Sequence, residues 1–404
     1  MQRVVIDEPY KFVPPIYSEL WPNLLRLYLR RYLRTSFGLE SVECRHVERL
    51  KASRTAGHSV LLAPNHSHPA DPMALGILGM AADCHLFAMA SWHVFKQSPF
   101  QTFMTRRMGA FSVLREGNDR QAIETAIQIL LARRRPLIVF PEGAITRHND
   151  IIDEVMDGPS FIARQAAKRL AKENKPGGVV IHPVATRYYF DGDVEKSVGP
   201  DLDKLEARLS WQPQRHLSIV ERIGKIGEAL LSLKEIEYLG APRCGNLFER
   251  VKQLVNEVLT RLESNWKIGD SSGNATARVK RLRTAILPDM VAGKVSPEER
   301  EQRWRDLAAA YYVQQIAHYP RDYILREHNL PERIIETVER LQEDFTDTIT
   351  FHPPMHAIIQ VGDAIAVGPQ RERGETGDPV MIEVRRQLQD MIDSMAAERT
   401  AVRI

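Results

Sequence analysis

Short apolar runs and longer amphipathic stretches alternate along the first half of the chain. Runs with strand character fall at residues 59–63, 85–90, 109–114, 137–140 and 179–181. Stretches with helical spacing separate them: one follows Asp71-Pro72, and two more cover 119–135 and 158–174. This alternation predicts an α/β fold, in which a central, mostly parallel sheet is flanked by helices.

The pattern changes in the second half of the chain. Residues from about 195 to 346 are charged and helix-like, and a Ser/Gly/Asn-rich stretch at 269–274 interrupts them as an exposed loop. Residues 355–367 return to strand character, and a final amphipathic helix is predicted at 380–399. No internal repeat is evident in the sequence.

A further amphipathic helix is predicted near the N-terminus, at residues 17–36. Leucines and tyrosines recur there at i, i+3 and i+4 spacing, and four arginines stand against one acidic residue, Glu19. Such a helix either lies on an anionic membrane surface, with its arginines at the lipid head groups, or docks on the protein with its arginines solvated. The pattern leaves both interpretations open.

The composition argues against several classes of protein. With 43% hydrophobic and 26% charged residues the chain is typical of globular proteins, and a net charge of +3 is too small to indicate nucleic-acid binding. The three cysteines are far apart, which argues against a disulfide framework or a thiolate zinc site and favours a reducing, cytoplasmic compartment. The first 15 residues lack the features of a signal peptide, and no segment has the roughly 18–20 uninterrupted apolar residues that span a bilayer.

Residues 63–72, APNHSHPADP, concentrate the candidate chemistry. One interpretation is a metal site in which His66, His68 and Asp71 ligate an ion, as in a metallohydrolase. The H-x-H-x-D-H pattern of metallo-β-lactamase-like hydrolases places the aspartate one residue earlier, and Pro72 stands where the next histidine belongs. We therefore expect no metal here and keep the metallohydrolase as a rival hypothesis.

The other interpretation pairs His66 with Asp71. On a single helix these residues would point about 140° apart, so they can meet only if the chain turns between them, as Pro69 permits. Asp71 would cap the following helix and accept a proton from the imidazole. The other nitrogen of His66 would then serve as a general base for a hydroxyl.

Three further motifs follow in order: GAFSVLR at 109–115, FPEGAITR at 140–147 and VIHPV at 180–184. Together with NHSHPAD at 65–71, they resemble the four motifs of the glycerolipid acyltransferase family, which includes glycerol-3-phosphate and 1-acylglycerol-3-phosphate acyltransferases. The resemblance covers about residues 20–195 and 350–400. It implies four regions: an N-terminal arm and membrane-association helix (1–40), an acyltransferase core (41–194), a mainly helical insertion of unknown role (195–346), and the closing strand and C-terminal helix of the core (347–404).

The resemblance also implies a reaction. A fatty acyl group would pass from the thioester of acyl-CoA or acyl carrier protein to a hydroxyl of a glycerol-phosphate or lysophospholipid acceptor, with no other cofactor. His66 would be the general base and Asp71 would orient it. The remaining roles would fall to Arg115 and Arg147 (acceptor phosphate), Glu142 (acceptor binding or bracing of the site) and Gly143 (backbone N–H groups for the oxyanion).

The chain departs from the family inside the third motif, where Ala144 and Ile145 replace Thr and Arg. The loss of a cation is compatible with an acceptor that has a different head group, and it motivates a second rival, a catalytically weak lipid-binding relative. We expect a peripheral protein on the cytoplasmic membrane. The acceptor lipid, the acyl chain, the donor, the role of the insertion and the oligomeric state stay open.

Overall fold

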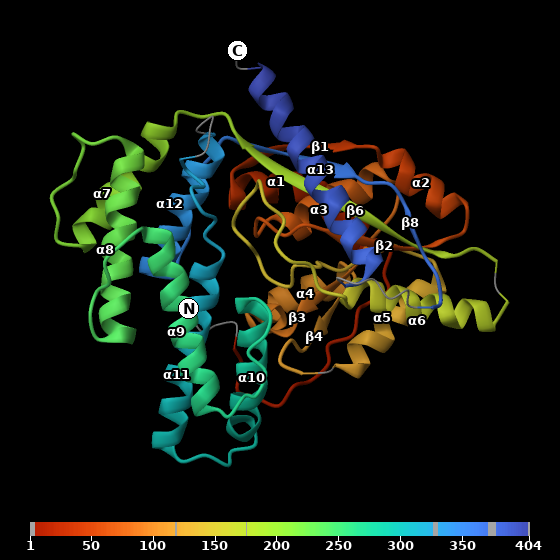
Figure 1. Cartoon of the computed structure of the whole chain (residues 1–404). Coiled ribbons are helices and arrows are strands. Elements are labelled where there is room, and N and C mark those ends of the chain that lie inside the picture. The colour runs from red at the N-terminus through yellow and green to blue at the C-terminus, as the bar shows by residue number, and fades with distance from the viewer. Residues whose placement is uncertain (1–4, 118, 175, 326–329, 371–376, 403–404) are drawn as a thin grey trace. The chain divides into compact units, whose positions relative to one another are not determined.

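The computed structural model describes residues 5–117, 119–174, 176–325, 330–370 and 377–402 of the chain (Figure 1). It divides the chain into two compact units. The sheet unit consists of Lys11–Asp191 and Pro353–Ile404, and the helical unit consists of Met1–Tyr10 and Gly192–His352. Among the described residues near the N-terminus, Val5 is buried in the core of the helical unit.

The sheet unit is an α/β fold, as the alternating pattern predicted. Its described strands form one eight-stranded sheet in the order β1-β7-β6-β2-β5-β3-β4, and β8 pairs with β6. The strands are β1 (Leu39–Arg45), β2 (Ser59–Pro64), β3 (Phe87–Ser91), β4 (Ala110–Val113), β5 (Leu137–Ile138), β6 (Val179–Phe190), β7 (Met355–Val361) and β8 (Ile365–Val367). Pairing is parallel except that β6 runs antiparallel to both β7 and β8.

Helices cover both faces of this sheet (Figure 1). The helices of the unit are α1 (Leu20–Phe37), α2 (Val47–Thr55), α3 (Asp71–Ala81), the 3₁₀ turn η1 (Trp92–Lys96), α4 (Pro99–Arg107), α5 (Arg120–Ala132), α6 (Gly158–Lys172) and α13 (Pro379–Val402). Residues of α5, α6 and α13 share one buried apolar core with alternate residues of the central strands. None of the helices in the described part of the chain is long and apolar enough to cross a bilayer.

Two strand predictions were wrong in their bounds, and both concern strands that bear on the site. The run at 179–181 predicts only the start of β6, which continues through nine further residues to Phe190. Every residue of β6 is buried, including polar residues such as Thr186 and Arg187. These residues interrupt the apolar run, so the run predicted too short a strand. The predicted strand at 355–367 is two strands, β7 and β8, both antiparallel to β6.

The helical unit contains the helices that the charged second half of the sequence predicted. They are α7 (Val194–Arg208), α8 (Ile219–Leu239), α9 (Leu247–Asn265), α10 (Ala275–Val291), α11 (Pro297–Ala317) and α12 (Pro331–Thr346). The stretch at 269–274 is the predicted loop, and its last residue, Asn274, caps α10.

The expectation that the chain has no internal repeat is wrong. The N-cap residues Ser218, Asn246 and Asn274 are spaced 28 residues apart, and an arginine follows each by four positions, at 222, 250 and 278. Each arginine is buried and makes a two-bond ion pair with a buried glutamate of the preceding helix. The pairs are Arg222–Glu206, Arg250–Glu235 and Arg278–Glu263. A planar guanidinium matches a carboxylate in this geometry, so each pair fixes how one helix packs on the one before it.

Replacing Glu235 with Ala should destabilise the helical unit by about 3–5 kcal/mol, because Arg250 would remain buried without its carboxylate partner. Glu228→Ala is the matched control, since Glu228 contacts the same arginine at 3.4 Å from a side chain that is 66% exposed. It should cost about 0–1 kcal/mol. Urea unfolding of the full chain measures both, and equal costs would contradict a clamping role for the buried pair.

Candidate active site

The candidate site lies where β2 ends and α3 begins. Asn65 follows β2, and its side-chain amide makes two hydrogen bonds with the backbone of Thr186 on β6, at 2.9 and 2.7 Å. The chain then turns through residues 66–70, so His66 and Asp71 face each other. Their Nδ1 and Oδ2 atoms are 2.9 Å apart. The structure thus brings together the two residues that the sequence paired across a turn.

Asp71 is fully buried, and three groups hold its carboxylate. Oδ2 accepts hydrogen bonds from His66 Nδ1 and from the backbone N–H of His68, each at 2.9 Å. Oδ1 accepts one from the hydroxyl of Tyr188 on β6, at 2.5 Å. Asp71 is not the helix cap that we expected, because α3 has Ala70 at its N-cap position and no side-chain cap. Its carboxylate is used for the turn and the histidine instead.

His68 has a supporting position in this turn. Its Nδ1 accepts the backbone N–H of Ala70 at 3.0 Å, and its ring packs on that of Tyr188 with the centroids 4.5 Å apart. Burial, reinforced by the charges of Arg147 and His66, lowers the pKa of His68 to about 3. His68 is therefore neutral at physiological pH.

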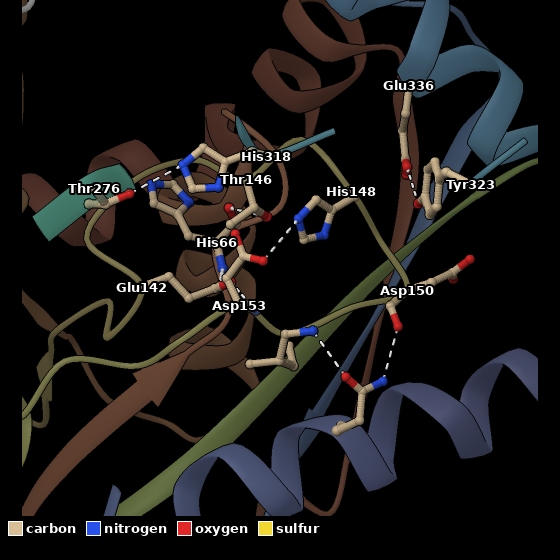
Figure 2. Close-up of polar contacts among 12 residues, drawn as sticks. His66, Glu142, Thr146, His148, Asp150, Asp153, Thr276, His318, Tyr323 and Glu336 are labelled. Atoms are coloured by element: carbon tan, nitrogen blue, oxygen red, sulfur yellow. Dashed lines mark hydrogen bonds and ion pairs between the residues drawn. The ribbon is translucent and has the colours of Figure 1, made fainter. Parts of the chain in front are cut away.

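The loop after β5 supplies the other walls of the site. The ring of Phe140 stacks on that of His66, with the centroids 4.0 Å apart. Glu142 Oε1 accepts the backbone N–H of His66 at 2.7 Å, and its Oε2 accepts that of Asp153 at 3.2 Å. Thr146 donates its backbone N–H to the carbonyl of His66 at 2.8 Å (Figure 2). Glu142 is thus placed to brace the backbone of His66, one of the two roles that the sequence left open.

The C-terminal helix α13 and strand β6 fix the rest of this loop. Gln389 on α13 donates to the carbonyl of Asp150 and accepts the N–H of Ile152, both at 3.0 Å. Asn149 makes two hydrogen bonds with the backbone of Tyr188, and Asp150 pairs with the buried Arg187. Residues after the helical unit in sequence therefore hold a loop that precedes it.

The remaining predicted residues lie at different distances from this pair. Gly143 has φ +71°, a backbone conformation that residues with a side chain rarely adopt, so the position favours glycine. Arg147 lies close enough to His68 for its charge to lower the pKa of that ring. Arg115 follows β4, which is three strands from β2, or about 14 Å at about 4.8 Å per strand. An acceptor would have to bridge this span for Arg115 and His66 to act on one molecule.

The contacts of His66 fix the orientation of its ring. Its Nδ1 is engaged by Asp71, and the carboxylate is shared with His68 and Tyr188. Within the described ranges, no group of three or more His, Cys, Asp and Glu side chains is arranged to hold a metal ion.

Comparison with known proteins identifies the class to which this site belongs. Residues 41–187 match the model of the Acyltransferase family. The search of curated proteins finds no match for the chain. The matched segment begins in β1, contains the His66–Asp71 turn and ends in β6. This segment is therefore an acyltransferase domain, which supports a general acyltransferase function for the protein.

Glu142 should make the free energy of unfolding depend on pH. Burial raises the pKa of Glu142 from 4.5 to about 8, although the two N–H donors oppose this shift. The folded protein therefore holds a proton that the unfolded chain releases, and this stabilisation is lost as pH rises from 4.5 to about 8. Between these values the free energy of unfolding should fall by up to about 1.4 kcal/mol per pH unit relative to Glu142→Gln, which cannot ionise. Denaturant unfolding of both proteins across this range measures the difference, and parallel curves would contradict it.

Proposed function

We propose that the protein transfers a fatty acyl group from the thioester of acyl-CoA or acyl carrier protein to a hydroxyl of a glycerol-phosphate or lysophospholipid acceptor. The observation that carries the proposal is the buried contact of His66 with Asp71, at 2.9 Å. The acyltransferase domain sets the class of reaction. A base beside a buried carboxylate is what an alcohol needs to attack a thioester.

In this mechanism His66 Nε2 takes the proton of the acceptor hydroxyl while the hydroxyl oxygen attacks the thioester carbon. Asp71 holds Nδ1, so it fixes the tautomer and stabilises the imidazolium that forms. When the tetrahedral intermediate collapses, the carbon–sulfur bond breaks and the imidazolium protonates the leaving thiolate. His66 is neutral again at the end, and no acyl-enzyme is required.

The acceptor is proposed to carry a phosphate. Arg147 follows Thr146, whose backbone contacts His66, and its charge acts on the neighbouring ring of His68. Neutral His68 beside it does not compete for the anion. Arg115 lies farther along the same edge of the sheet, at the carboxyl end of β4. A phosphate bound by one or both arginines would orient the acceptor hydroxyl toward His66.

We also propose that the protein binds the surface of an anionic bilayer through α1 and α4. Leu20, Leu24 and Leu27 follow each other at i, i+4 and i+7 on α1, and they are 72%, 53% and 84% exposed. Phe100 on α4 is 72% exposed. Leu29 and Leu33 face the core instead, so α1 has a second apolar stripe that its docking does not use.

Aromatic and cationic contacts join the two helices. Trp21 and Phe103 pack edge to face with their ring centroids 5.2 Å apart, and the guanidinium of Arg107 lies over both rings. Arg30, Arg31 and Arg34 are exposed on α1. Exposed leucine and phenylalanine side chains beside arginines suit the boundary between acyl chains and anionic head groups.

Replacing His66 with Ala should lower kcat for acyl transfer by about 10²–10⁴-fold, because the general base is lost. The measurement is product formation by the purified protein from acyl-CoA and a panel of lysolipids that includes lysophosphatidate. His46→Ala is the matched control, since the His46 side chain is 45% exposed, and it should retain full activity.

Unchanged turnover in the His66 variant would overturn the proposed role of that residue. Stoichiometric zinc or manganese in the purified protein, measured by mass spectrometry, would favour the metallohydrolase. Absence of transfer by the unaltered protein on every acceptor, with lysolipid binding retained, would favour the lipid-binding relative.

Replacing Leu24 and Leu27 together with Glu should weaken binding to phosphatidylglycerol-containing vesicles by at least about tenfold, because two apolar contacts are lost and two charges repel the surface. The double variant Leu233→Glu/Ile236→Glu is the matched control, since these α8 residues are 52% and 49% exposed. Co-sedimentation with vesicles measures both. Equal binding by the two variants would contradict the proposed surface, and a monomer–dimer shift in the α1 variant alone would identify a second copy as the occupant.

A further inference from the structure

We propose that Tyr188 is a positioning residue of the active site, which holds Asp71 and thereby sets how strongly His66 binds a proton. This inference rests on the proposed role of His66 as general base. The Tyr188 hydroxyl donates to Asp71 Oδ1 at 2.5 Å, and the opposite oxygen of the same carboxylate holds His66. Tyr188 lies one residue beyond the segment that matches the family model.

The fold aims this hydroxyl with little freedom. Tyr188 is 2% exposed, and it lies near the end of β6, the strand that pairs with β2 on one side and β7 on the other. Two asparagines bind the backbone of this part of β6: Asn65 at Thr186 and Asn149 at Tyr188. Asn65 directly precedes His66, and Asn149 belongs to the loop that carries Glu142. The backbones of His66, of the Glu142 loop and of Tyr188 are therefore fixed to one another.

Tyr188 and its neighbour Tyr189 point to opposite faces of the sheet. Successive side chains of a strand point to opposite faces, so Tyr188 reaches Asp71 on α3 while Tyr189 donates its hydroxyl to the carbonyl of Met395 on α13, at 3.0 Å. Both tyrosines are buried, and both hydroxyls are hydrogen-bonded. The strand therefore offers two matched tyrosines, of which one touches the catalytic pair.

The charges around His66 and Asp71 explain how the Tyr188 hydroxyl affects proton binding by His66. Burial and the charge of Asp71 raise the pKa of Tyr188 well above its ordinary value, so the phenol keeps its proton and acts as a donor. His66, His68 and Tyr188 contact the carboxylate, Glu142 faces the same turn, and Arg147 lies beside His68. A donor on Oδ1 draws charge from the carboxylate, so Asp71 stabilises the His66 imidazolium less than it would alone.

Replacing Tyr188 with Phe removes this donor and keeps the ring. The titration midpoint of the His66 imidazole should move up by about half to one pH unit, because the carboxylate regains its full charge. The acid limb of kcat/KM should move in the same direction. The kcat should fall roughly tenfold because Asp71 is held less firmly. Tyr189→Phe, which removes an equally buried hydroxyl on the opposite face, should leave the His66 midpoint and kcat unchanged.

The midpoint is read by NMR of the full chain labelled with ¹⁵N-histidine, and His66→Ala assigns the signal. A merely structural role of Tyr188 would lower stability without moving this midpoint, so an unshifted midpoint in folded Tyr188→Phe overturns the inference. If that variant does not fold, 3-fluorotyrosine at position 188 strengthens the donor and should lower the midpoint; no change there is equally contradictory. Full activity of His66→Ala would overturn the proposed base itself, while loss of activity in that variant with no effect in Tyr188→Phe would overturn this inference alone.

Discussion

The site depends on one buried carboxylate, that of Asp71. A charge in such a position is tolerated only when hydrogen bonds replace the lost water. His66, the backbone N–H of His68 and the hydroxyl of Tyr188 provide those bonds. The three donors come from two parts of the chain more than 100 residues apart. Because the imidazole is itself one of these donors, the interaction that helps to satisfy the buried carboxylate also orients the ring.

A chain of hydrogen bonds links the C-terminal helix α13 to the backbone of His66, so the site needs residues from both ends of the sheet unit. Strand β7 lies between β1 and β6, and α13 packs on the face of the sheet opposite Tyr188. From α13, Gln389 fixes the backbone at Asp150 and Ile152, the next residue binds Glu142, and Glu142 binds the N–H of His66. The helical unit is inserted between the parts of this assembly. Within the helical unit, buried arginine–glutamate pairs, whose arginines are 28 residues apart, fix how successive helices pack.

Much of this could be predicted from the sequence, and the failures have physical causes. Apolar runs located the strands other than β1, whose sequence LESVECR contains no apolar run. The break at Pro69 between His66 and Asp71 indicated the turn that brings these two residues together. Tyr188 was missed because β6 is buried on both faces and contains the polar residues Thr186 and Arg187, which are buried there instead of solvated. The repeat was missed because it is defined by a cap, an arginine and a glutamate, with few identical residues between them. Both Tyr188 and the repeat are recognised by contacts with residues distant in sequence or on another helix, and no local pattern encodes such contacts.

The central claim is that this site joins an acyl group to a lipid hydroxyl, and the most direct test is the stoichiometry of the reaction. Radiolabelled acyl-CoA and lysolipid acceptors are incubated with the purified protein in the presence of a chelator, and acylated lipid, free thiol and free fatty acid are measured together. The account predicts one acylated lipid for each thiol released, with no dependence on divalent cations. Release of thiol with free fatty acid as the product, or turnover abolished by the chelator, would contradict it.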